Sequence, residues 1–248
     1  MRTRVLKIPA AVLRAVGLLV FPSVCKRCSR FLERPGEKVV CTECLAGLRP
    51  WTGAVCGSCG RFLDSAESRP ICLSCLTDPP SCRIHRSVGA YAGILKDLIL
   101  LLKYKDYAVL GPELAGFLYD SLRDDAEIWR DADVLLPVPL HPKRERERGF
   151  NQSLIIAREL GGKTGIPVDK GCLVKIRNAP PQTSLEAKAR AGNVRGAFRV
   201  KKPARIAGKT VVLVDDVCTT GSTLRACGEA LLEAGVKEVR AVTLARTL

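Results

Sequence analysis

The fold is decided by the stretch Val211-Val212-Leu213-Val214-Asp215-Asp216-Val217-Cys218-Thr219-Thr220-Gly221-Ser222-Thr223-Leu224. Its apolar run, residues 211–214, does not alternate with polar residues, which is typical of a central parallel strand covered on both faces. Helical spacing of apolar residues follows and stops at Gly235, and residues 239–244 are predicted to form the next strand. The loop between strand and helix should therefore lie at the carboxyl edge of a sheet, where open α/β folds bind ligands.

This loop carries the groups that bind a phosphorylated sugar. Backbone N–H groups of residues 219–223 lie at a helix N-terminus, where they lack helical acceptors and meet the positive end of the helix dipole. Gly221 lets the backbone approach an anion, and hydroxyl donors come from Thr219, Thr220, Ser222 and Thr223. Asp215 and Asp216 would repel a phosphate, so we expect them to face solvent and contact sugar hydroxyls or a hydrated magnesium ion. Together these features describe a ribose 5-phosphate site.

The loop is neither a Walker A motif nor a dinucleotide fingerprint, because it lacks Gly-Lys-Ser/Thr and the G-x-G-x-x-G spacing. Residues 211–223 closely resemble the phosphoribosyl pyrophosphate motif of type I phosphoribosyltransferases. That resemblance implies a ligand of phosphoribosyl pyrophosphate with Mg²⁺. The plainer alternative is a strand and helix whose two acids only end the sheet and cap the helix.

Eight of the cysteines form an internal repeat of 31 residues. This shift carries Cys25-x-x-Cys28 and Cys41-x-x-Cys44 onto Cys56-x-x-Cys59 and Cys72-x-x-Cys75. Tetrahedral zinc takes four thiolates, so each copy is predicted to hold one structural zinc ion. The predicted ligands are Cys25, Cys28, Cys41 and Cys44 for one ion, and Cys56, Cys59, Cys72 and Cys75 for the other. An interleaved pairing of alternate knuckles and a disulfide framework are the alternatives that spacing leaves open.

The other cysteines and His85 carry less signal. Cys82, Cys172 and Cys227 are interpreted as small packed hydrophobic residues. Cys218 lies beside the predicted helix N-terminus, where we expect a lowered thiol pKa. His85 is assigned no function.

Charge and length give the organisation of the chain. The net charge is +15 over 248 residues; residues 1–88 contribute +8 (14 Lys/Arg, 6 Asp/Glu) and residues 89–248 contribute +7 (26 and 19). The cysteine-rich part is therefore the more densely basic, which suggests a polyanionic partner or a solvated surface with none. We predict an amphipathic helix over residues 1–24, a double zinc ribbon over 25–85 and an α/β domain over 86–248. No transmembrane or targeting segment is evident, so a cytoplasmic location is expected, with a weak membrane-surface role for the first helix as the alternative.

The α/β domain shows a second candidate loop. Helices are predicted over residues 94–102, 110–122 and 153–160, and a strand over 133–136. That strand leads through Leu140 and His141 into Lys143 and the cationic run 143–148. Arginine and lysine at the carboxyl edge of a sheet would suit a pyrophosphate. A solvated helical turn with internal Glu–Arg pairing explains the run equally well.

Over nearly its full length the chain resembles the ComF family of bacterial competence proteins. Besides the knuckles and the Asp215-Asp216 loop, the resemblance rests on Leu102-Lys103-Tyr104, Val138-Pro139-Leu140-His141-Pro142, Arg148-Gly149-Phe150-Asn151-Gln152, Gln182-Thr183-Ser184-Leu185 and Arg190 with Asn193-Val194-Arg195-Gly196-Ala197-Phe198. It implies a double zinc ribbon followed by a type I phosphoribosyltransferase-like parallel sheet with helices. It also implies handling of single-stranded DNA in natural transformation, with a DNA-translocating helicase as a partner.

The resemblance assigns roles by position. Asp215 and Asp216 would face the ribose hydroxyls, the hydroxyl-rich loop would hold the 5-phosphate, and Leu140, His141 and Lys143 would lie at the pyrophosphate. Arg190 would belong to a segment that closes over the ligand. Two other functions remain open: a metabolic or salvage phosphoribosyltransferase with purely structural zinc ribbons, and a nucleic-acid-binding module with a vestigial pocket. The acceptor for any transfer is not named by the residues.

Overall fold

The computed structural model describes residues 23–32, 37–63, 70–177 and 196–248 of the chain. These fall into two compact units, Met1–Leu48 and Arg49–Leu248, and each unit contains one cysteine repeat. The predicted helix over residues 1–24 lies almost entirely outside the described residues. The predicted boundaries at 24 and 85 stay predictions, although the second repeat belongs to the same compact unit as the sheet.

The two repeats, here called the first ribbon (residues 24–46) and the second ribbon (residues 55–77), fold alike. In each, the N–H group of the first cysteine donates to a carbonyl on the far side of the knuckle: Cys25 to Arg30 at 2.7 Å, and Cys56 to Arg61 at 2.8 Å. A short helix begins directly after the third cysteine of each copy, α2 (Thr42–Ala46) in the first and α3 (Leu73–Thr77) in the second. The sequence repeat is therefore also a structural repeat.

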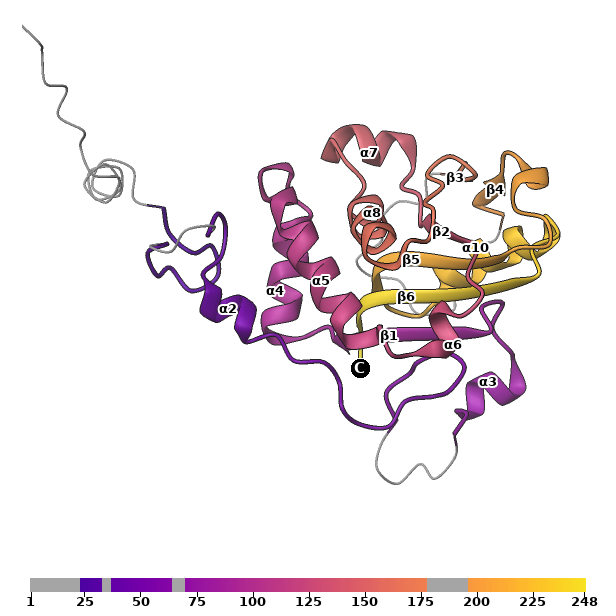
Figure 1. Cartoon of the computed structure of the whole chain (residues 1–248), viewed down its shortest axis with the longest axis horizontal. Coiled ribbons are helices and arrows are strands. Elements are labelled where there is room, and N and C mark those ends of the chain that lie inside the picture. Colours follow the sequence, from indigo (N-terminus) through magenta and orange to yellow (C-terminus); the bar gives the residue numbers. More distant parts are fainter. Residues whose placement is uncertain (1–22, 33–36, 64–69, 178–195) are drawn as a thin grey trace, which may run out of the picture. The chain divides into compact units, whose positions relative to one another are not determined.

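The larger unit is built on four parallel strands (Figure 1). Their order across the sheet is β1 (Ile84–Ala90), β6 (Glu238–Arg246), β5 (Thr210–Cys218) and β2 (Val134–Pro137). Val211 on β5 pairs with Val134 on one side and with Val239 on the other. The strand predicted from residues 211–214 is therefore central, as its unbroken apolar run indicates.

Helices cover β5 on both faces. The side chains of residues 211–214 are fully buried, and two of them, Val211 and Leu213, share an apolar cluster with Leu224 of helix α10 (Ser222–Glu233). The other two point to the opposite face, because side chains alternate along a strand. Helix α8 (Gln152–Thr164) packs on β2 and β5, and α5 (Gly111–Leu122) packs on α8. The predicted α/β class, a parallel sheet with helices, is confirmed.

Sequence periodicity located most elements of this unit to within a few residues. The helix predicted over residues 94–102 is α4 (Gly93–Leu102), and the strand predicted over 133–136 is β2. An antiparallel pair, β3 (Leu173–Lys175) and β4 (Phe198–Val200), was not predicted, because strands of three residues are too short to show alternation. The remaining elements are η1 (Lys105–Leu110), α6 (Ala126–Trp129), α7 (Pro142–Arg148) and η2 (Pro203–Arg205).

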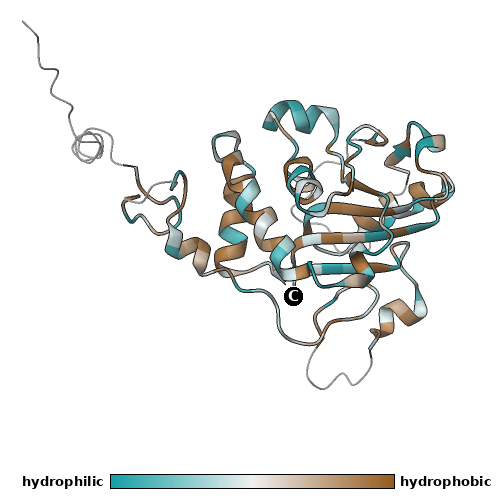
Figure 2. Cartoon of the chain, viewed as in Figure 1, coloured by the Kyte–Doolittle hydropathy of each residue, from teal (hydrophilic) through white to brown (hydrophobic). Residues whose placement is uncertain are grey.

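Helix α7 is hydrophilic along its length, whereas the strands of the sheet contain apolar stretches (Figure 2). Among the described residues, no helix combines the length and the apolar character needed to cross a bilayer.

Candidate ligand-binding and metal sites

The β5–α10 loop, residues 219–223, presents hydrogen-bond donors to solvent. Thr219 and Thr220 are exposed, and Gly221 has a φ of 79°, a left-handed conformation that favours glycine. Within the described part of the chain, the N–H groups of Thr219, Thr220 and Thr223 donate to no acceptor. The hydroxyls of Thr220 and Ser222 lie 3.0 Å apart. Free N–H groups and hydroxyls at the start of a long helix suit an anion.

Asp215 differs from the sequence-based expectation. It lies inside β5 rather than after it, and it is buried rather than facing solvent. One oxygen, Oδ1, accepts hydrogen bonds from Ser153 Oγ at 2.8 Å and from the N–H group of Asp216 at 2.9 Å. Burial, followed by the negative charge of Asp216, raises the pKa of Asp215 to about 8. This carboxyl therefore keeps a proton under conditions in which an exposed aspartate has lost it.

Asp216 is buried as well, and it has an unsatisfied oxygen. Its Oδ1 accepts a hydrogen bond from the N–H group of Val217 at 3.0 Å. Its Oδ2 is buried and accepts no hydrogen bond from any described residue; the nearest cation, Lys103 Nζ, lies 3.6 Å away, beyond hydrogen-bond distance. Because buried carboxylate oxygens are normally satisfied, Oδ2 lacks a partner that a bound hydroxyl group or a hydrated Mg²⁺ ion could supply. The residues present thus fit the expected magnesium-bound sugar.

The loop after β2 reaches the same edge of the sheet. β2 and β5 are parallel, and beyond their last pair the N–H group of Val138 donates to the carbonyl of Val214 at 2.9 Å. Leu140 and His141 follow, half-exposed, and Lys143 is exposed on the first turn of α7. His141 is the N-cap of α7, where its Nδ1 accepts a hydrogen bond from the Lys143 N–H group at 3.2 Å. This ring nitrogen is a structural acceptor, not a free proton donor.

The cations of α7 extend beyond this loop, but one predicted residue cannot be placed. Arg148, at the end of α7, donates to the side chain of Gln152, and burial lowers its pKa while Asp216 acts in the opposite sense. Arg148 therefore lies close enough to Asp216 to interact with its charge. Arg190, predicted to belong to a closing segment, lies outside the described residues.

Each ribbon brings its four thiols together. The Sγ atoms of Cys25, Cys28, Cys41 and Cys44 lie within 4.8 Å of one another, and so do those of Cys56, Cys59, Cys72 and Cys75. Measured Sγ–Sγ separations are 3.8 Å for Cys25–Cys44, 3.6 Å for Cys28–Cys41 and 3.8 Å for Cys59–Cys72. A tetrahedron with Zn–S bonds of about 2.3 Å has edges of about 3.8 Å. The clusters fit one zinc ion per repeat, and the interleaved pairing is excluded.

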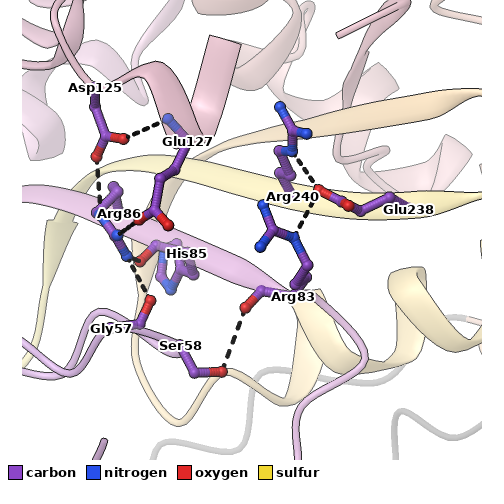
Figure 3. A network of polar contacts seen from close by, with 9 residues as sticks. All are labelled: Gly57, Ser58, Arg83, His85, Arg86, Asp125, Glu127, Glu238 and Arg240. Atoms are coloured by element: carbon purple, nitrogen blue, oxygen red, sulfur yellow. Dashed lines mark hydrogen bonds and ion pairs between the residues drawn. The ribbon is translucent and has the colours of Figure 1, made fainter. Parts of the chain in front are cut away.

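The second ribbon packs directly against β1. Gly60 has a φ of 65°, and a Cβ atom there would lie 2.4 Å from the carbonyl oxygen of His85, so only glycine fits. Arg86 fixes the same knuckle, since its Nη1 donates to the carbonyl of Gly57 at 2.8 Å and its Nη2 to Glu127 Oε2 at 2.8 Å (Figure 3). The residue that matches Gly60 in the first ribbon is Ser29, at a φ of 61°. At this turn the first copy has a serine side chain, whereas the second copy has none.

Arg246 connects the second metal cluster with the β5–α10 loop. Its Nη1 donates to the carbonyl of Cys59 at 2.8 Å and lies 3.3 Å from Cys218 Sγ. His85 Nδ1 lies 3.0 Å from the same Cys59 oxygen, and burial, followed by the charge of Arg246, lowers the pKa of His85 to about 3. Sequence reasoning missed the contacts of Arg246 and His85. Arg246 and Cys59 are 187 positions apart, and no local sequence pattern indicates such a contact.

Cys218 also differs from expectation. Burial raises the pKa of its thiol to about 11, although the charge of Arg246 acts in the opposite sense. The helix N-terminus does not compensate for the loss of water around the sulfur, so the expected lowering of the Cys218 thiol pKa is wrong. Cys82, Cys172 and Cys227 are buried, as predicted for packed residues.

Comparison with protein families matches two parts of the chain. Residues 148–248 match the phosphoribosyl transferase domain family, and residues 17–76 match the double zinc ribbon domain family. The first match contains the acids and the β5–α10 loop, and the second contains all eight clustered cysteines.

Comparison with individual proteins gives relatives that match most of the chain. "DNA utilization protein YhgH" of Salmonella typhimurium is 33% identical over 178 residues, 70% of this chain and 76% of that protein. "Competence protein ComFC" of Bacillus subtilis is 30% identical over 222 residues, 88% of both chains. Among solved structures, the allosteric regulatory enzyme of purine biosynthesis is 27% identical with a TM-score of 0.37, over 55% of this chain and 26% of that one. This chain thus spans about a quarter of that enzyme.

Proposed function

Because this chain belongs to the ComF family, we propose that it binds phosphoribosyl pyrophosphate with Mg²⁺ and handles single-stranded DNA during natural transformation. The names of its relatives, a competence protein and a DNA utilization protein, support the DNA part. The match to phosphoribosyl transferases and the chemistry of one sheet edge support the ligand part. A cytoplasmic location and a DNA-translocating helicase as partner remain predictions.

The single observation that carries the ligand proposal is the buried, unsatisfied Oδ2 of Asp216. It lies one residue after a protonated carboxyl and three residues before the free donors of the β5–α10 loop. A ribose 5-phosphate offers hydroxyls to the acids and a phosphate to the loop, so it satisfies both at once. Phosphate alone would leave the acids without a partner.

The pyrophosphate part of the ligand belongs to the loop after β2. Leu140 and His141 shape this loop, and the exposed cation of Lys143 attracts the pyrophosphate. Arg190 is proposed as a further contact. Mg²⁺ would neutralise charge on the pyrophosphate. If transfer occurs, an acceptor displaces pyrophosphate at C1 of the ribose, and fixed sugar contacts with cations near the leaving group stabilise that transition state.

Calorimetry with phosphoribosyl pyrophosphate and Mg²⁺ tests this proposal. We expect saturable binding by the parent protein and at least about tenfold weaker binding by Asp216→Asn, since a buried charge-assisted hydrogen bond contributes about 1.5–3 kcal/mol. Glu229→Gln, on the outer part of α10, is the matched acid-to-amide control and should bind like the parent. Equal binding by parent and Asp216→Asn would place the sugar elsewhere.

The salvage alternative has a separate readout. A metabolic phosphoribosyltransferase would release pyrophosphate when supplied with a nucleobase, whereas the proposed function requires ligand binding but no free-base acceptor. Pyrophosphate release with purine or pyrimidine bases would replace the proposal by the salvage function. Salt-sensitive DNA binding without any affinity for phosphoribosyl pyrophosphate would leave the nucleic-acid-binding module with a vestigial pocket.

A further inference from the structure

A cavity of about 730 Å³ opens between the second ribbon and the β5–α10 loop. Phe62 and Cys75 line it from the second ribbon, residues 219–222 from the loop, and residues 246–248 from the end of β6 and beyond. Among the described residues that line it, neither of the two buried acids nor any residue of the loop after β2 appears. The cavity therefore shares the phosphate-binding loop, residues 219–222, with the proposed sugar site but extends away from the acids. Its size is typical of small-ligand sites.

An aromatic pair forms one surface of this cavity. The rings of Trp51 and Phe62 are stacked, with centroids 4.3 Å apart and an angle of 28° between their planes. Trp51 remains 37% exposed, so part of its ring is open to a ligand. The matching residue of the first ribbon, Phe31, is 55% exposed and has no aromatic partner among the described residues. Within the ranges that the structure describes, a stacked aromatic pair is therefore found beside the second ribbon and not beside the first.

A cation without a counter-ion stands beside the aromatic pair. Arg61 is exposed, lines the cavity and forms no ion pair within the described part of the chain. Its match in the first ribbon, Arg30, lies 3.6 Å from Glu43. The residue that matches Glu43 is Ser74, which also lines the cavity. The exchange of an acid for a hydroxyl leaves Arg61 available to an anion.

We propose that this cavity binds a nucleotide unit, with the base against Trp51 and Phe62 and the phosphate held by Arg61. Planar bases stack on aromatic rings, and arginine binds phosphate oxygens through paired N–H groups. A sugar between them would face the hydroxyls of Ser74 and Thr220. The inference goes beyond the proposed function, since it holds whatever ligand occupies the edge at Asp215. A free mononucleotide and one residue of a single strand carry the same chemistry.

Matched substitutions in the two ribbons test the site. The zinc-loaded full-length chain is titrated with thymidine 5′-monophosphate and, separately, with a fluorescein-labelled thymidine oligonucleotide at low salt. Phe62→Ala and Arg61→Glu should each weaken binding about tenfold or more, given about 1–3 kcal/mol for stacking one base. The controls Phe31→Ala and Arg30→Glu, which change the same residues in the first ribbon, should bind nearly as the parent does.

The outcomes distinguish a free mononucleotide from a single strand as the ligand, and they show which results contradict the inference. If Phe62→Ala loses binding of both probes, the site accepts any nucleotide. If it loses binding of the oligonucleotide alone, the site is specific for a strand. No binding by the parent, or equal weakening by first- and second-ribbon variants, overturns the inference. If Phe62→Ala loses zinc, Arg61→Glu decides, because Arg61 contacts Cys56 through its backbone carbonyl, which the substitution keeps, and its side chain is exposed. Asp216→Asn should weaken binding of phosphoribosyl pyrophosphate but not of either nucleotide probe, so failure of the proposed function and failure of this inference can be told apart.

Discussion

A single carboxyl, Asp215, illustrates how burial changes the chemistry of a common residue. Its sequence context, directly after four apolar residues, says that it lies at a sheet edge, but the hydrogen bond from Ser153 is made across 62 positions. Burial, followed by the neighbouring charge of Asp216, raises the pKa of Asp215 to about 8, although the hydrogen bond from Ser153 acts in the opposite sense. The edge therefore holds one hydrogen-bond donor and one acceptor instead of two equal anions.

The raised pKa of Asp215 predicts a pH-dependent stability. Its folded pKa, about 8, exceeds the ordinary value of 3.8, so above that ordinary value the unfolded chain binds fewer protons than the folded one. Stability should then fall as pH rises toward 8, and Asp215→Asn should abolish this part of the decline. We expect the stability difference between variant and parent to change by about 2 kcal/mol between about pH 6 and about pH 8, since each pH unit below the folded pKa corresponds to about 1.4 kcal/mol. Thermal unfolding with saturating zinc measures it; parallel pH profiles would contradict the assignment.

Lys143 gives a second test at the residue scale. It is exposed at the start of α7, so Lys143→Ala removes a charge without disturbing the core. Affinity for phosphoribosyl pyrophosphate should fall about three- to tenfold, as expected for one charged contact at a partly screened site, while ribose 5-phosphate should bind as before. Lys163, at the far end of α8, is the matched control. An equal loss for both ligands would mean that Lys143 does not contact the pyrophosphate.

At the scale of elements, the two ribbons share a fold but differ in their neighbours. The knuckle at Gly60 lies against the β1 backbone. The carbonyl of Cys59 accepts a hydrogen bond from Arg246, whose side chain also contacts Cys218. A zinc ion held by Cys59 and its partners would thereby fix the carbonyl that positions Arg246 next to Cys218, at the start of the β5–α10 loop. The first ribbon belongs to the other compact unit.

Removing one metal at a time should expose this difference. Cys59→Ser should release one zinc ion and weaken phosphoribosyl pyrophosphate binding about tenfold or more, because removal of a structural zinc unfolds its module. Cys28→Ser, its match in the first ribbon, should also release one zinc ion but leave that affinity unchanged. Elemental analysis and calorimetry on the same samples provide both numbers. If the two variants behave alike, the contact through Arg246 does not support the loop.

Sequence patterns located those elements whose signal is local. The run of residues 211–214, the left-handed Gly221 and the 31-residue shift are each complete within a short window, and the structure confirms the strand, the turn and the metal clusters drawn from them. The burial of Asp215, the raised pKa of Cys218 and the role of Arg246 depend on residues far along the chain. Periodicity carries no information about such contacts, so these features could only be seen in the fold.

For the whole molecule, charge is the property that matters most for a DNA partner. The chain carries a net charge of +15, and its first 88 residues contribute +8. Binding of a single-stranded oligonucleotide should be tolerant of sequence and should weaken steeply with salt, since each neutralised phosphate contributes a slope of about −0.7 in a plot of log K against log salt. Arg30→Glu with Arg61→Glu should flatten this slope. A fluorescence titration at several salt concentrations measures it, and a slope unchanged by the double reversal would remove the ribbons from the DNA contact.

The strand order has a consequence for synthesis on the ribosome. β6 comes after β1, β2 and β5 in the chain, yet it lies between β1 and β5 in the sheet. A nascent chain that has emerged only as far as β5 cannot join β1 to the sheet, because β6 pairs with both strands. The apolar residues 211–214 then lack β6 as a neighbour. All eight clustered cysteines are already available to zinc. The ribbons should therefore mature first and the sheet close in one late step. Released chains that end before Glu238 should retain zinc but be cut rapidly by protease within β5.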